Sequence, residues 1–206
     1  MKFSVFNPFK HIAGMKAFAI GLPVILLSSV LGYLSHTHFD GVLDAHMADY
    51  GTLYCYIAEG LIDFICLLVI FYIAGIIISG FHFRFIDMIG TIALSRVPMI
   101  LIPLAAFLFP QQKIMDYLNH TFLKTGDPVA LTATDLTGFI ISVSVMIIVL
   151  IWTVALLFNA YKICVNKKGT KLIVSFIIAL LVSEVVSKIL IIHFFPNPTL
   201  NQFFTK

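Results

Sequence analysis

Charged residues are scarce in this chain. Asp, Glu, Lys and Arg together make up 11% of its 206 residues, against roughly 25% in a typical soluble domain. Hydrophobic residues make up 60%, and the mean hydropathy is +1.04. A water-soluble fold cannot bury so much apolar surface, so the composition excludes a soluble protein and predicts a membrane protein.

Cysteines and catalytic motifs are also few or absent. Three cysteines are present; Cys55 and Cys66 fall about 16 Å apart on one predicted helix and Cys164 lies near the opposite membrane face, so we expect no disulfide. The chain has no CxxC, GxGxxG, HExxH or GxSxG sequence, and no GxxxxGK followed by Ser or Thr. These absences argue against phosphate-binding, zinc-protease and serine-hydrolase functions. The sequence therefore predicts no enzyme activity and no required cofactor.

Five stretches are apolar enough and long enough to cross a bilayer as helices. A hydrocarbon core of about 30 Å needs roughly 20 helical residues for each crossing. The predicted spans are 17–34, 53–79, 88–109, 138–161 and 171–195. The fold class expected is all-α: a polytopic transmembrane bundle (17–195) of five spans, preceded by segment 1–16 and followed by an outer tail, 196–206.

The third predicted span contains Arg96, Pro98 and Pro103. Proline lacks a backbone donor and clashes with the preceding turn, so we expect this span to be kinked. A broken span or a re-entrant hairpin is the alternative for this segment.

Basic residues cluster in alternate connections between the spans. The N-terminal segment and the connections after spans two and four contain most of them, whereas connection 36–49 has no Lys or Arg. The positive-inside rule therefore predicts a cytoplasmic N-terminus and an outer C-terminus. The lysines expected at the cytoplasmic membrane surface are Lys2, Lys10, Lys16, Lys162, Lys167, Lys168 and Lys171.

The N-terminal segment alternates Phe3, Phe6 and Phe9 with lysines. This pattern favours a segment that lies in the headgroup layer against anionic lipid. Pro8 and Gly14 weaken a helix there, so a disordered basic tail is the alternative. We do not interpret the first span as a secretory signal, because its apolar core is too long and no small-x-small cleavage site follows it.

Five ionisable residues fall inside the predicted spans, where each needs a partner or a functional role. Glu59 and Asp63 share one helix face, as do Glu184 and Lys188. Counted from the outer helix ends, Glu59 and Lys188 each lie about 9 Å deep, and Asp63 and Glu184 each lie about 15 Å deep. Arg96 lies about 20 Å deep and points toward Asp63 or Glu184. We expect one buried polar network in the outer half of the bilayer, formed by Glu59, Asp63, Arg96, Glu184 and Lys188.

Three acids against two bases leave one carboxyl in excess in this network. A dry cluster would keep that carboxyl protonated or bind a cation. Internal pairing that fixes the helix register, with no ion movement, is the alternative.

The outer loop after the first span is rich in histidine and aspartate, which are ligands for zinc and related divalent ions. In an extended segment His36, His38 and Asp40 would point the same way, and Asp44 and His46 would repeat the arrangement. A solvated polar loop is the alternative. The residues predicted as metal ligands are His36, His38, Asp40, Asp44, His46 and Asp49, with Asp116 and His120 from the second outer loop.

Several short motifs resemble those of a known family. The chain has Asn7-Pro8-Phe9 near its start, Arg96 and Pro98 in its third span, LLFNAYK at 156–162 and NKKGTK at 166–171. These motifs are similar to those of bacterial members of the Yip family, the Ypt/Rab-interacting membrane proteins, over nearly the whole chain. The resemblance implies five spans, a cytoplasmic N-terminus and location in the bacterial inner membrane. Eukaryotic relatives have a longer N-terminal region with an Asp-Leu-Tyr-Gly-Pro-type motif, which this chain lacks, so small GTPase binding is not expected.

Two functions are compatible with these features. The first is a non-catalytic membrane component that organises lipid or partner proteins through its basic connections. The second is a proton- or cation-coupled transporter, or a divalent-metal-binding membrane protein, that uses Glu59, Asp63 and Glu184 with the outer loop. The partners expected are the lipid bilayer, anionic lipid at the cytoplasmic face and other proteins, but no nucleic acid.

Overall fold

The computed structural model describes residues 5–48, 50–109 and 111–195. Lys2, Asp49 and the predicted tail 196–206 lie outside these residues. The described chain is mainly helical, and five of its helical segments are long and apolar enough to cross a membrane, as the sequence predicts. The protein is therefore a multi-pass membrane protein.

The bounds of the five segments agree with those of the predicted spans to within five residues. They are α1 (Gly14–Ser35), α2 (Leu53–Ser79), α3 to α4 (Phe85–Leu108), α6 (Ala133–Val165) and α7 (Thr170–Phe194). Short elements complete the fold: η1 (Pro8–Lys10), β1 (Thr37–His38), β2 (His46–Met47), α5 (Gln112–Leu118) and the π-helical turn η3 (Asn119–Leu123).

Local sequence explains where α6 begins and ends. The Thr132 side chain accepts from the Asp135 N–H, and the Asp135 carboxylate accepts from the Thr132 N–H, which is a complete capping box. Asn166 ends the helix in the left-handed conformation, with φ of 51°. Gly169 then precedes α7, so α6 and α7 are separated by a four-residue turn in which Asn and Gly adopt positive φ.

The third apolar segment is not one continuous α-helix. Helix α3 (Phe85–Ser95) ends before Arg96, a 3-10 turn η2 (Val97–Ile100) follows, and α4 (Leu101–Leu108) continues the segment. Pro98 lies in the first turn of η2, where a missing N–H is tolerated. The interruption leaves Arg96 at the junction between the two helices.

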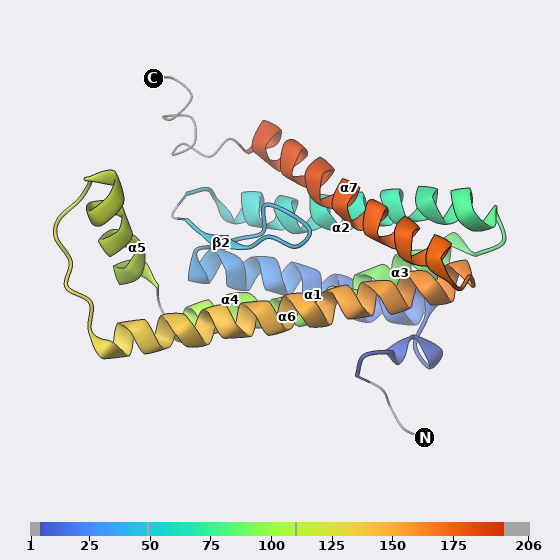
Figure 1. The fold of residues 1–206 in the computed structure, drawn as a ribbon, viewed down its shortest axis with the longest axis horizontal. Helices are drawn as coiled ribbons and strands as arrows, with labels where there is room; N and C mark the ends of the chain where they lie inside the picture. Colours follow the sequence, from blue (N-terminus) through green and yellow to red (C-terminus); the bar gives the residue numbers. More distant parts are fainter. Residues whose placement is uncertain (1–4, 49, 110, 196–206) are drawn as a thin grey trace.

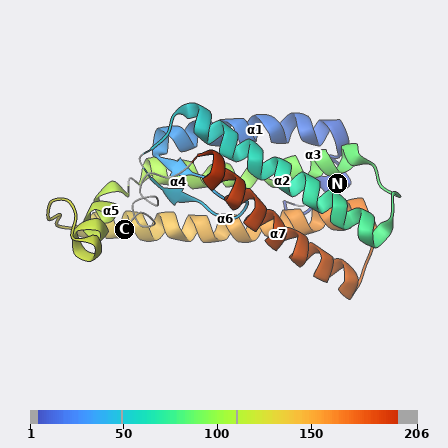
Figure 2. The same ribbon diagram turned by 90° about the horizontal axis from the view of Figure 1, so that it is seen from above.

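Close helix contacts depend on small residues. Helix α1 packs against α3, and an added Cβ at Gly21 would lie 2.3 Å from the Ala93 carbonyl carbon. Helix α2 packs between α1 and α7, and α6 runs along α3 and α4 (Figures 1 and 2). The main core is formed by buried side chains from α1, α2, α3, α6 and α7, including Ile25, Leu67, Phe71, Met88, Leu157, Tyr161 and Phe176.

The two ends of the bundle differ in charge. One, here called the basic end, has the N-terminal segment, the α2–α3 connection and the α6–α7 turn (Figure 1). It contains the exposed residues Lys10, Lys16, Arg84, Lys162, Lys167, Lys168 and Lys171. The opposite end, here called the loop end, has the β1–β2 ribbon and α5.

The outward faces of the helices are apolar. Ile77 is 76% exposed, Ile148 64% and Leu181 60%. Such side chains are stable outside the core only when hydrocarbon surrounds them, which agrees with a bilayer around the bundle.

The N-terminal segment folds back against α6. Phe9 is buried against Ala17, Leu156 and Ala160. The Asn159 side chain donates to the Phe6 carbonyl at 2.8 Å. Phe6 and Phe9 therefore hold this part of the N-terminal segment against α6, while Lys10 and His11 stay exposed.

Candidate functional site

The loop between α1 and α2 folds back into the bundle. Thr37 pairs with Met47 and His38 with His46, which makes a two-stranded antiparallel ribbon. Beyond the ribbon, Phe39 is 3% exposed and Val42 is fully buried. Val42 belongs to the same core as Ile92 and Leu180. The loop is therefore re-entrant, and its tip lies among the membrane-spanning helices.

A re-entrant loop has backbone polar groups that helices would satisfy internally. At membrane depth each unsatisfied group costs several kcal/mol, so such loops need partners from the protein. Arg96 Nη1 donates to the Val42 carbonyl at 2.6 Å. The Leu43 N–H donates to Glu184 Oε2 at 2.8 Å. Two of the ionisable residues predicted as a network thus bind the loop backbone directly.

Two more charged side chains complete the contacts: Asp63 pairs with Arg96, and Lys188 lies against both Glu184 and the loop residue Asp44. Arg96 Nη2 lies 3.1 Å from Asp63 Oδ2, and both side chains are almost fully buried. Lys188 bonds to the Asp44 carboxylate and lies 3.7 Å from Glu184 Oε1. The predicted network and the predicted metal loop therefore form one polar cluster, made of His38, Asp40, Asp44, His46, Glu59, Asp63, Arg96, Glu184 and Lys188.

Glu59 is paired with His38 and not with Lys188, the base that its depth suggests. His38 Nδ1 lies 2.9 and 3.1 Å from the two Glu59 carboxyl oxygens, and both residues are fully buried. His38 is also stacked between two phenol rings, with centroids 4.1 Å from Tyr50 and 4.0 Å from Tyr56. The ring is held on both faces and at both nitrogens.

The second ring nitrogen determines how protons are arranged in this pair. His38 Nε2 lies 3.1 Å from the Tyr50 carbonyl oxygen, which can only accept, so Nε2 carries a hydrogen. Nδ1 faces a carboxyl group, so a second proton must lie between Nδ1 and Glu59, on one or the other. The His38–Glu59 pair is neutral overall in either arrangement.

His46 and Asp40 form the outer, more accessible part of the cluster. Their side chains are 34% and 23% exposed, and His46 Nδ1 lies 3.2 Å from Asp40 Oδ1. Burial raises the pKa of Asp40, but the hydrogen bond and charge of His46 outweigh burial and leave this pKa below its ordinary value. Burial lowers the pKa of His46, but the Asp40 partner outweighs it and leaves this pKa raised. Burial also raises the pKa of the neighbouring Tyr50 phenol.

Asp63 is the most isolated acid of the cluster. It is fully buried, and its Oδ2 accepts from Arg96. Its Oδ1 has no hydrogen-bond partner of normal geometry, although Ser187 of α7 lies close to this carboxyl. The small cavity that Arg96 lines has a volume of about 10 Å³, which is at the lower limit for one water molecule.

The loop does not run as a single extended segment, because β1 and β2 pair with each other in antiparallel fashion. His36 ends α1 in the left-handed conformation, with φ of 55°, and is exposed, whereas His38 is buried. Asp44 bonds to Lys188 while His46 bonds to Asp40, so these two side chains have different partners. The left-handed cap turns the backbone between the two histidines.

The predicted metal ligands do not converge on one point. Asp116 and His120 belong to α5 and η3, which lie beyond the end of α6 and apart from the ribbon (Figure 2). Asp116 accepts from Gln112 at 3.2 Å. Within residues 5–48, 50–109 and 111–195, no three His, Cys, Asp or Glu side chains are grouped so that they could hold a metal ion.

Some of these contacts have no signal in the sequence. Nothing identifies Tyr50 and Tyr56 as neighbours of His38, or the Val42 carbonyl as a partner of Arg96. One signal for re-entry exists, because Phe39, Val42 and Leu43 are apolar residues within an otherwise polar connection.

A second contact joins two of the motifs that carry the family resemblance. The Asn7-Pro8-Phe9 segment packs on LLFNAYK (156–162), where Phe9 contacts Leu156 and Ala160. These motifs are therefore packing partners at the basic end.

Comparison of the chain with protein-family models, curated proteins and solved structures finds no match.

Proposed function

We propose that this chain is a non-catalytic, membrane-organising protein of the Yip type that binds anionic lipid at its basic end. In this proposal the N-terminus is cytoplasmic, the membrane is the bacterial inner membrane, and the third span bends where η2 interrupts it.

One observation supports this proposal most strongly: the buried charges are used to hold a loop. Arg96 and Glu184 bind the loop backbone, Asp63 balances Arg96, and His38 pairs with Glu59. Among the five residues predicted from the helices, Glu59 is the carboxyl without a basic partner, and His38 from the loop pairs with it. Lys188 lies against both Glu184 and the loop carboxylate of Asp44, and the Leu43 N–H also binds Glu184. A buried network that is paired in this way serves packing and needs no transported ion.

The lysines of the basic end provide the functional surface. Lys162, Lys167, Lys168 and Lys171 are exposed, and no acidic residue lies between 162 and 183. Each lysine near an anionic surface contributes about 1 kcal/mol, which is about a fivefold preference. The proposal is therefore a protein that gathers anionic lipid around one end of its bundle.

Lipid selectivity tests this function. The full chain would be reconstituted with spin-labelled phosphatidylglycerol or phosphatidylcholine, and the immobilised fraction of each lipid measured. We expect a preference for phosphatidylglycerol that falls several-fold in a variant with Lys162, Lys167 and Lys168 changed to Gln. The matched control changes Lys113 and Lys124, at the loop end, to Gln. Equal immobilisation of both lipids by the unchanged protein would disprove the proposal.

Orientation has its own test. In a background without Cys55, Cys66 and Cys164, single cysteines would be placed at Lys168 and at Thr125. A membrane-impermeant thiol reagent applied to intact cells should label position 125 and not position 168. The reverse pattern would invert the proposed topology.

A proton-coupled carrier is a second candidate, favoured by the unpaired Oδ1 of Asp63. A buried carboxyl with a free oxygen can take up a proton. Proteoliposomes with and without a proton gradient, screened over divalent cations, distinguish the two functions. Flux that Asp63→Asn abolishes would support the carrier, and proton uptake equal to that of empty liposomes would exclude it.

A further inference from the structure

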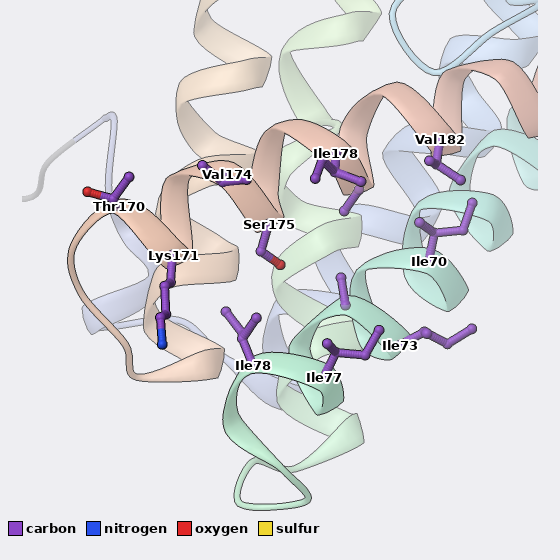
Figure 3. Close-up of a pocket in the computed structure, with 12 residues that line it drawn as sticks. Ile70, Ile73, Ile77, Ile78, Thr170, Lys171, Val174, Ser175, Ile178 and Val182 are labelled. Carbon is purple, nitrogen blue, oxygen red and sulfur yellow. The ribbon is translucent and has the colours of Figure 1, made fainter.

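An apolar groove runs between α2 and α7 at the basic end (Figure 3). Its volume is about 660 Å³, within the range of about 300–1,000 Å³ found for ligand sites. The walls are aliphatic side chains of both helices, including Ile70, Ile73, Ile77, Val174, Ile178 and Val182. Ile77 and Ile178 are 76% and 56% exposed, so the groove opens toward the surrounding lipid.

The groove has one polar end. Thr170 and Lys171 lie at the start of α7, and Gly169 separates this helix from Lys167 and Lys168. The Ser175 hydroxyl, further along, is 2.7 Å from the Tyr161 hydroxyl and is already bonded. The groove thus offers an ammonium group at its mouth and hydrocarbon along the rest of its length.

The length of the groove matches one leaflet. On α7 it extends from Thr170 to Val182, which is about 18 Å of helix. Half of a hydrocarbon core is about 15 Å. An acyl chain whose phosphate lies at Lys171 would therefore follow the groove to about the bilayer midplane.

We propose that this groove binds one anionic phospholipid, with an acyl chain between α2 and α7 and the phosphate at Lys171. This inference deepens the proposed lipid function and rests on it. The groove would hold a single molecule for longer than the general lysine surface does, because chain and headgroup are bound together.

Charge favours a lipid over a second copy of this chain as the occupant. Two copies joined through this groove would bring their Lys167, Lys168 and Lys171 side chains together, and neither 64–86 nor 162–183, which line the groove or adjoin it, contains an acidic residue. Like charges at such a contact are repulsive, whereas a phosphate complements them.

Native mass spectrometry of the detergent-purified full chain, with phosphatidylglycerol added, tests the groove. We expect one retained lipid, reduced about fivefold by Lys171→Gln, as one lysine–phosphate contact predicts. Ile178→Trp should block the groove and remove the retained lipid. The matched control, Ile148→Trp, makes the same change on the lipid-facing side of α6 and should leave it. Equal retention in Ile178→Trp and Ile148→Trp would overturn the proposal.

A photo-crosslinking arm needs no substitution. Phosphatidylglycerol with a diazirine on its acyl chain should label peptides containing 70–78 and 174–182. Label spread evenly over α6 and α7 would count against the groove. A dimer that Ile178→Trp disrupts would identify a second copy as the occupant and would also overturn it.

The two proposals fail in different ways. If the lysine surface has no lipid preference but one lipid is retained and mapped to the groove, the broader function fails alone. If spin-label selectivity persists while Ile178→Trp leaves retention unchanged, only the groove proposal fails.

Discussion

His38 and Glu59 are joined by a hydrogen bond of 2.9 Å although no solvent reaches either side chain. One residue belongs to a loop and the other to a membrane-spanning helix. The pair shows how the loop is held: a polar group that enters the bundle meets a matching group already there.

Replacing Glu59 should destabilise the protein. We expect Glu59→Leu to lower the free energy of unfolding by about 1–3 kcal/mol, because His38 Nδ1 is left buried without a partner. Glu59→Gln keeps a hydrogen-bonding group at the same place and should cost less. Unfolding in detergent, followed by circular dichroism, measures both. Equal effects of Leu and Gln would contradict the pairing.

Arg96 supports the loop and needs Asp63 as its counterion. Arg96→Met leaves the Asp63 carboxyl buried and unpaired, so we expect the free energy of unfolding to fall by about 3–5 kcal/mol. In the double variant with Asp63→Leu, part of this loss should be recovered, because no buried charge remains. A double-mutant cycle from unfolding free energies measures the coupling. Strictly additive losses would show that the two side chains do not interact.

The stability contributed by the Asp40–His46 pair should depend on pH. The raised pKa of His46 means that its contribution is complete below its ordinary pKa of 6.5 and is lost as pH rises through the raised value. The lowered pKa of Asp40 means that its contribution is present above 3.8 and is lost as pH falls through the lowered value. Because both side chains are partly exposed, we expect the pair to contribute less than about 1 kcal/mol to the free energy of unfolding.

Thermal unfolding between pH 5 and 9 measures this contribution as the difference in midpoint temperature between the unchanged protein and His46→Asn, with His11→Asn as the control. The difference in midpoint temperature between the unchanged protein and His46→Asn should become smaller as pH rises above 6.5. A gap that widens toward alkaline pH would contradict the assigned sign.

Gly21 allows α1 and α3 to approach each other. Because an added Cβ would lie 2.3 Å from the Ala93 carbonyl carbon, Gly21→Ala must separate the two backbones. We expect the free energy of unfolding to fall by about 1–3 kcal/mol, which is typical of overpacking. Gly138→Ala is the matched control, since its nearest neighbour, Phe109 Cβ, would be at an ordinary 3.5 Å. Unfolding midpoints in detergent measure both; unchanged stability of Gly21→Ala would disprove the close approach.

The single tryptophan reports on the N-terminal segment. Trp152 bonds to Val5 and stacks edge-on with Phe6 at 6.3 Å, and Phe9 anchors this segment in the core. Phe9→Ala should release the segment, so we expect a shift in Trp152 emission and stronger quenching by acrylamide. Phe122→Ala, at a side chain that is 74% exposed, should change neither. Emission that is the same in all three proteins would show that the segment stays docked without Phe9.

The sequence by itself determined the medium around this protein and the five segments that cross it, because bilayer insertion depends on the length and hydrophobicity of each local stretch. It also identified the ionisable residues that need partners, and the depth of Arg96 left Asp63 and Glu184 both within its reach; the structure places Asp63 beside it. Only the tertiary structure decided that the loop between α1 and α2 enters the bundle, where His38 meets Glu59, the Val42 carbonyl meets Arg96 and the Leu43 N–H meets Glu184. These contacts join residues 21 to 141 positions apart. Loop direction depends on a left-handed turn at His36 and on the space between the helices, which no local pattern specifies.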